Sequence, residues 1–145
     1  MMWKVFIVSI ITAIGLSAGN LVIKKSHSSV DVTVTKMEQI IKQKGITLFN
    51  VIDFQAGAKS VGLKMNEAKL LIFGNPKLGT RIMQRDITAA IDLPMKVLVY
   101  KNSEGQTIIE YKDPKNLEKS YQLEDCVVLP KLSGALDKIT SKAAM

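Results

Sequence analysis

The chain has 145 residues, which gives room for one domain built around one hydrophobic core. Apolar residues make up 47% of it and charged residues 23%, a balance that argues against a disordered tail or a multi-span membrane protein. The formal net charge is +7, but the basic residues are scattered along the chain. This pattern favours a solvated basic surface over a nucleic-acid site.

The first 19 residues have the layout of a signal peptide. Lys4 supplies a positive start, a mostly apolar run follows it, and small residues allow cleavage after Gly19. The alternative is an uncleaved anchor formed by residues 5–23, which is long enough to cross a bilayer although its flanking charges oppose the positive-inside rule. We therefore expect an exported, periplasmic protein, with anchoring in the inner membrane as the alternative. Nucleic acid is not expected as a partner, and membrane contact is expected only through an uncleaved N-terminus.

The polar residues 20–29 predict a linker, so the domain is expected to comprise residues 30–145. Valines alternate with polar residues over 30–35, which predicts a half-buried strand. Apolar residues at helical spacing then predict a helix that ends at Gly45. The domain should therefore open with a strand followed by a helix.

A run of β-branched and aromatic residues predicts the next strand over 46–54, and the small residues of 56–62 could form a short helix. A compact apolar run predicts a strand over 69–73, which ends in a Gly-Asn-Pro turn. Thr80 is expected to cap the following helix, which Pro94 ends. The residues expected on the inner face of that helix are Ile82, Met83, Ile87, Ala90 and Ile91.

Residues 97–112 have the pattern of a β-hairpin around the four-residue loop Asn-Ser-Glu-Gly. The pair Asp113-Pro114 predicts another short helix, with the aspartate as its cap. Apolar residues from Leu132 onward are spaced for a C-terminal helix that packs on the sheet. The sequence therefore predicts one compact α+β domain with an antiparallel sheet packed by helices.

Few residues in the chain could carry chemistry. The only histidine, His27, lies in the expected linker, and the carboxylates show no spacing typical of an acid/base pair or a calcium loop. Cys126 is the only cysteine, so no intrachain disulfide can form, and its apolar neighbours indicate a buried thiol. We therefore expect no catalytic residue, no metal and no cofactor. Aromatic side chains could line an apolar pocket, although their spacing favours the core: Phe54, Phe73, Tyr100, Tyr111 and Tyr121.

The segment 74–80 superficially resembles a phosphate-binding loop, because it follows a strand, contains two glycines and opens a helix. The lysine that such a loop places before its threonine is missing, since Thr80 directly follows Gly79. What remains is an anion site made by N–H groups at a helix N-terminus beside basic side chains. The residues expected to form this site are Lys77, Gly79, Thr80, Arg81 and Arg85.

Several stretches together resemble the family called domain of unknown function 302. The resemblance covers the chain from about Val30 to the C-terminal helix, and its clearest stretches are Leu70–Thr80, Met83-Gln84, Ile91–Tyr100, Tyr111–Pro114 and Leu132–Asp137. It implies a compact α+β fold similar to that of the TATA-binding protein, a plausible homodimer, and no established activity. Many members have a histidine after the aspartate of the second strand, whereas Phe54 follows Asp53 here, which puts any metal or acid/base role at that position in doubt.

These patterns together favour a non-enzymatic exported module that binds a small anionic or apolar ligand or a partner. The alternative is an anion-binding or phosphate-binding protein, or an enzyme, that uses the loop and helix N-terminus in residues 74–85.

Overall fold

The structure is a computed structural model that describes residues 20–145. Its strands are β1 (Leu21–Ser26), β2 (Thr47–Asp53), β3 (Ala68–Gly74), β4 (Met95–Lys101) and β5 (Thr107–Lys112). Its helices are α1 (Val30–Gln43), α2 (Phe54–Ser60), α3 (Pro76–Met83) and α4 (Val128–Ala144), with the 3-10 helices η1 (Ile87–Asp92) and η2 (Pro114–Lys119). The expected signal peptide, and the alternative anchor up to residue 19, lie outside the described residues.

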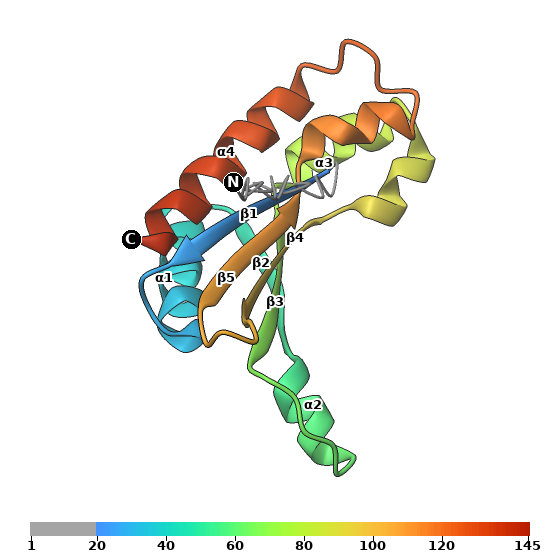
Figure 1. The fold of residues 1–145 in the computed structure, drawn as a ribbon. Coiled ribbons are helices and arrows are strands. Elements are labelled where there is room, and N and C mark those ends of the chain that lie inside the picture. Colours follow the sequence, from blue (N-terminus) through green and yellow to red (C-terminus); the bar gives the residue numbers. More distant parts are fainter. Residues whose placement is uncertain (1–19) are drawn as a thin grey trace, which may run out of the picture.

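The strands form one antiparallel sheet in the order β1-β5-β4-β3-β2, and helices α1 and α4 cover one of its faces (Figure 1). The main core lies between this face and the two helices. It contains alternate residues of the central strands and the inner residues of both helices, among them Met37, Ile41, Leu71, Val97, Val99, Ile109 and Ile139. The expected α+β architecture is confirmed, including the hairpin of β4 and β5 and the C-terminal helix.

A second, smaller core lies beyond the end of the sheet, under α3, η1 and the start of α4. Its buried residues are Ile82, Ala89, Leu123, Cys126, Val128 and Leu129. The thiol of Cys126 is buried as the sequence indicated, with a residue exposure of 5%. This second core supports the cavity described below.

Residues 20–29 do not form a linker, because β1 occupies most of them. β1 pairs antiparallel with β5, from Leu21 opposite Lys112 to Ser26 opposite Thr107. The domain therefore begins about ten residues earlier than the sequence analysis placed it. Leu21–Ile23, the end of the alternative anchor segment, is part of this strand.

The strand expected over 30–35 is also wrong, because α1 begins at Val30. Ser29 caps it, and its Oγ accepts the N–H of Val32. The buried residues Val30, Val34, Met37 and Ile41 follow helical spacing, and Val32, which a strand would have buried with them, is 47% exposed.

Lys24 joins the edge strand β1 to α4. Its ammonium lies 2.7 Å from Asp137 Oδ1, 2.8 Å from Thr140 Oγ1, 2.7 Å from Ser141 Oγ and 3.0 Å from the carbonyl oxygen of Asp137. It also lies 5.9 Å from the centre of the Tyr111 ring. The hydrogen bond from Lys24 and its positive charge lower the pKa of the Asp137 carboxyl.

None of the helices described in residues 20–145 combines the length and the apolar character needed to cross a membrane.

Candidate ligand-binding cavity

An apolar cavity of about 500 Å³ lies where the ends of β3 and β4 meet α3, η1 and α4. A volume of this size falls within the range of small-molecule sites, roughly 300–1,000 Å³. Its lining residues are Phe49, Ile72, Gly74, Asn75, Pro76, Gly79, Thr80, Met83, Ala90, Leu93, Pro94, Met95 and Leu132. Only Asn75 and Thr80 bring polar side chains to this lining, so the cavity is suited to an apolar ligand.

The wall beside α3 is built by the sequence Gly74-Asn75-Pro76. Asn75 Oδ1 accepts the N–H groups of Lys77 at 3.0 Å and Leu78 at 3.3 Å, and Pro76 occupies the first turn, where a missing N–H costs nothing. A Cβ on Gly74 would lie 3.3 Å from Pro94 Cβ and 3.6 Å from Phe49 Cε2. Gly74 thus allows two lining residues to approach the backbone closely.

The helix expected to have Thr80 as its cap and to be ended by Pro94 is wrong in both its start and its extent. α3 begins at Pro76 because Asn75 supplies the cap, and it ends at Met83; a separate 3-10 helix, η1, follows. Ile82 is buried and Met83 lines the cavity, as predicted for residues on the inner face of the helix. Ala90 also lines the cavity but is exposed, and Ile87 and Ile91 face solvent with exposures of 70% and 80%.

Hydrogen bonds join η1, which contributes Ala90 to the cavity lining, to residues 121–124. Asp86 Oδ1 accepts the Thr88 hydroxyl at 2.6 Å, and Asp86 Oδ2 accepts the N–H of Gln122 at 3.0 Å. These bonds lower the pKa of Asp86. At the other end of η1, the Tyr121 hydroxyl donates to Asp92 Oδ2 at 2.7 Å, and this bond to a carboxylate raises the pKa of Tyr121. These bonds fix the position of η1, which we call the roof of the cavity.

The residues expected to form an anion site do not come together on one surface. Gly79 and Thr80 line the cavity, whereas Lys77 and Arg81 point about 110° and about 150° around α3 from the mean direction of its lining residues, at about 100° per residue. Arg85 lies beyond the helix and donates to the carbonyl oxygen of Glu124 at 2.9 Å.

The N–H groups of the first turn of α3 are also engaged within the chain. Those of Lys77 and Leu78 bond the Asn75 side chain, and that of Gly79 bonds the Asn75 carbonyl oxygen at 2.9 Å. Anion binding at this loop stays a prediction, and the arrangement offers less for it than the sequence suggested.

The cavity lining contains no titratable side chain, so it presents no general acid, general base or ionised nucleophile. Within residues 20–145, no three histidine, cysteine or carboxylate side chains are grouped so that they could hold a metal ion. Asp53, at the position where the family resemblance raised a metal or acid/base role, caps α2 by accepting the N–H of Ala56 at 2.9 Å. The cavity lining thus offers apolar contacts together with two uncharged polar side chains, Asn75 and Thr80.

The aromatic residues expected as possible pocket-lining residues lie outside this cavity. Phe73 and Tyr111 are in the main core, and Tyr100 donates to Glu110 Oε2 at 3.0 Å on the opposite face of the sheet. Phe49, which the sequence analysis did not single out, is the aromatic residue that lines the cavity. It sits at the irregularity in pairing between Leu48 and Asn50, which period-2 reasoning cannot anticipate.

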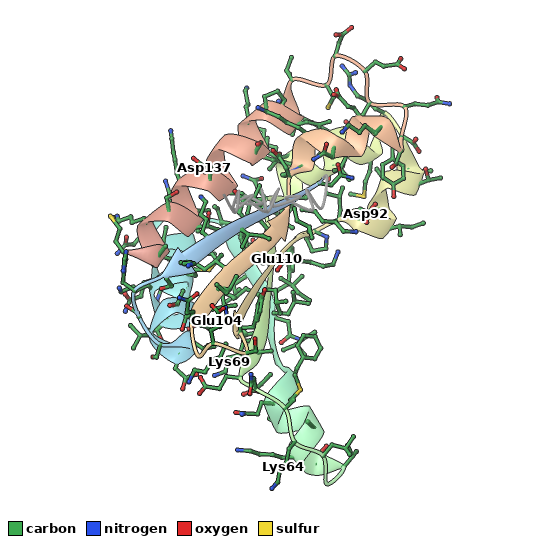
Figure 2. The ribbon with its side chains drawn as sticks, in the orientation of Figure 1. Lys64, Lys69, Asp92, Glu104, Glu110 and Asp137 are labelled. Carbon is green, nitrogen blue, oxygen red and sulfur yellow. The ribbon has the colours of Figure 1, made fainter. Side chains whose placement is uncertain are left out.

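A second hollow of about 340 Å³ lies on the face of the sheet opposite α1 and α4. It contains charged residues, and Figure 2 labels two of its carboxylates, Asp92 and Glu110. Both accept hydrogen bonds from tyrosines, and a third lining carboxylate, Asp113, caps η2. Its carboxylates thus have structural roles, and the apolar cavity is the stronger candidate site.

Comparison with known proteins gives a family and a fold. A family model described as "Domain of unknown function DUF302" matches residues 22–139. A solved structure, described as an uncharacterized conserved DUF302 protein from Bacillus stearothermophilus, superposes with a TM-score of 0.69. The match covers 88% of this chain and 97% of that chain, at 19% sequence identity.

Curated relatives at higher identity carry a different description. Proteins named "Fluoride-specific ion channel FluC 1" from Brucella suis biovar 1 (strain 1330) and Brucella abortus biovar 1 (strain 9-941) are each 35% identical over 103 residues. These residues are 71% of this chain but only 41% and 38% of the two relatives. The chain thus spans about two fifths of the length of these relatives.

Proposed function

The chain belongs to the family of the domain of unknown function DUF302, and from that premise we propose that it is an exported, non-catalytic module that binds an apolar small molecule. The observation that carries the proposal is the cavity of about 500 Å³ with its almost wholly apolar lining. Burial of apolar ligand surface provides the main driving force for binding in such a site. The side chains of Asn75 and Thr80 would orient the ligand at the edge of the cavity.

The proposed place of work is beyond the inner membrane, next to a membrane surface. The signal-peptide pattern of residues 1–19 supports export. The relatives are named as fluoride-specific ion channels, and similarity to part of an ion channel supports the proposed location near a membrane. We carry over no channel activity, because the match covers about two fifths of those proteins. The N-terminal residue of the native protein, read by mass spectrometry, tests export: Asn20 is expected, and a cytoplasmic chain that keeps Met1 would contradict it.

Ligand binding can be tested by filling the cavity from α3. Gly79 lines the cavity, and a Cβ placed on it meets nothing within 4 Å, so Gly79→Leu would put an apolar side chain into the space a ligand needs. Gly134→Leu is the matched control, because Gly134 also lies in a helix with open space around its Cβ. Both changes replace a helical glycine by a good helix former, so neither should destabilise the fold.

The measurement is a titration with the neutral apolar dye N-phenyl-1-naphthylamine, followed by its fluorescence. The unchanged protein and Gly134→Leu should bind the dye saturably and with equal affinity, and Gly79→Leu should bind at least tenfold more weakly. Dye at about 100 times its dissociation constant should also stabilise the unchanged protein by about 2.7 kcal/mol. Equal binding by both variants, or no saturable binding by the unchanged protein, would remove the support for the cavity as a ligand site.

A further inference from the structure

Residues 54–66, which we call the arm, contain α2 and the turn that leads back to β3. The arm projects beyond the end of the sheet (Figure 1), and no residue of α2 is buried. Its large apolar side chains are exposed: Phe54 by 41%, Val61 by 69%, Leu63 by 65% and Met65 by 43%. The chain itself gives these side chains no apolar partner sufficient to cover them, so they are available to something else.

Backbone hydrogen bonds within the arm close its turn at residues 61–63. The N–H of Leu63 bonds the carbonyl oxygen of Ala58 at 2.9 Å, and the N–H of Gly62 bonds that of Lys59 at 3.1 Å. Gly62 has a φ of +74°, a conformation that a glycine adopts without strain. These peptide groups can therefore approach an apolar phase without the cost of unpaired backbone donors.

All charged side chains of the arm are positive. Between Asp53 and Glu67 there are two lysines, Lys59 and Lys64, and no carboxylate. Asp53 is held as the cap of α2, and Glu67 Oε1 lies 3.0 Å from the ammonium of Lys101. Figure 2 shows Lys64 at the far tip of the arm, away from the sheet.

We propose that the arm binds the surface of an anionic phospholipid bilayer. Val61 and Leu63 enter the boundary between headgroups and acyl chains, and Lys59 and Lys64 stay at the level of the phosphates. Exposed apolar side chains combined with basic residues on a short helical segment are the features that bind such an interface. A second arm from another copy would bring like charges together, so a bilayer fits the arm better than self-association does.

The proposed contact is separate from the N-terminal segment. Leu21 pairs with Lys112 at the end of the sheet that leads to η2, whereas the arm leaves the opposite end (Figure 1). Residues 1–19 are apolar and would bind vesicles by themselves, so the experiment uses residues 20–145. Residues 20–145 contain all of the described fold, and the match covers 97% of the solved Bacillus stearothermophilus chain, so that chain consists almost wholly of the same fold.

The test is co-sedimentation of residues 20–145 with vesicles at about 0.1 M salt, where surface charges still act over roughly 10 Å. Vesicles of equal parts phosphatidylglycerol and phosphatidylcholine should bind the protein, and vesicles of phosphatidylcholine alone should bind it at least tenfold more weakly. The double change Val61→Ser with Leu63→Ser should weaken binding to the anionic vesicles at least tenfold. Lys59→Gln and Lys64→Gln should each weaken it about fivefold.

Matched controls separate the arm from the basic surface in general. Ile87→Ser with Ile91→Ser removes two equally exposed isoleucines from η1, and Lys115→Gln with Lys119→Gln removes two exposed lysines from η2. Both control variants should bind within about twofold of the unchanged protein. Equal losses in controls and arm variants, or unchanged binding by the arm variants, would overturn the proposal. Loss of a concentration-dependent dimer in the arm variants, without loss of vesicle binding, would instead assign the arm to a second copy.

Discussion

Replacement of Lys24 by methionine tests whether the N-terminal strand is held in place by its contact with α4. Lys24→Met keeps most of the apolar stem but removes the ammonium that lies within 3.0 Å of four oxygen atoms, on Asp137, Thr140 and Ser141. If residues 20–29 were a mobile linker, the change would cost nothing. Because β1 is an edge strand that pairs only with β5, we expect a clear loss of stability.

The size of this loss follows from the exposure of the two partners. The side chain of Lys24 is 18% exposed, while that of Asp137 is 66% exposed, so the ion pair alone is worth at most about 1 kcal/mol. Hydrogen bonds to a charged group contribute about 1.5–3 kcal/mol when they are shielded from water. An ammonium has only three N–H groups for the four oxygens, so not all four bonds reach full strength. We therefore expect the free energy of unfolding to fall by about 1–2 kcal/mol.

The assay is urea unfolding of residues 20–145, followed by circular dichroism, with Lys25→Met as the control. Lys25 follows Lys24 in the same strand but points to the opposite face of the sheet, and it is exposed. Its replacement should change stability by less than about 0.5 kcal/mol. Equal effects of the two changes, or a loss below about 0.5 kcal/mol for Lys24→Met, would refute this account of how β1 is held.

Two further predictions concern acid pH and the roof of the cavity. Asp86 and Asp137 have folded-state pKa values below the ordinary 3.8, so both carboxylates stabilise the fold above that value and lose their contribution as the pH falls through the folded-state pKa. The urea concentration at the unfolding midpoint should therefore decrease as the pH is lowered from about 5 to about 3. The decrease should be less steep for Asp137→Asn than for the unchanged protein, and an equally steep decrease in both would contradict this account. Tyr121→Phe removes the hydroxyl that bonds Asp92 at 2.7 Å, and should lower the midpoint of urea unfolding and weaken dye binding as the roof loosens. Unchanged stability and unchanged binding would show that the bond does not support the roof.

Sequence patterns predicted the central part of the fold because those elements carry strong local signals. The hairpin of β4 and β5 has alternating strands around a polar loop, and Asp113-Pro114 starts η2 as a cap and first-turn pair should. The sequence of α4 has apolar residues at helical spacing over several turns, which predicts a helix. In each of these segments, local propensity and tertiary packing favour the same structure.

The errors occurred where one segment satisfies two patterns. Val30, Val32 and Val34 alternate like a strand, yet Val30 and Val34 also lie four residues apart, in line with the helical positions Met37 and Ile41. The longer helical spacing prevails because it buries more apolar surface. β1 was missed for a related reason: as an edge strand it needs only one partner and tolerates lysines, so its sequence looks like that of a polar loop.

The candidate site was predicted only in part. The sequence indicated that residues 74–85 turn a strand into a helix, and two of the expected residues, Gly79 and Thr80, do line the cavity. The cap-and-proline signal of Asn75-Pro76 was interpreted as a turn alone, so the helix cap was placed five residues too late. Phe49 and Leu132 reach the cavity from distant parts of the chain, and no local pattern brings them together.

The strand order has a consequence for how a newly made chain acquires its structure. The first strand bonds only to the last one, with Leu21 opposite Lys112, and the C-terminal helix then closes over both. β1 therefore has no strand to pair with until β5 has been synthesised, and contacts between such remote positions form slowly. A sheet with this strand order is therefore completed late in synthesis, after the central strands β2, β3 and β4 have been able to pair with one another.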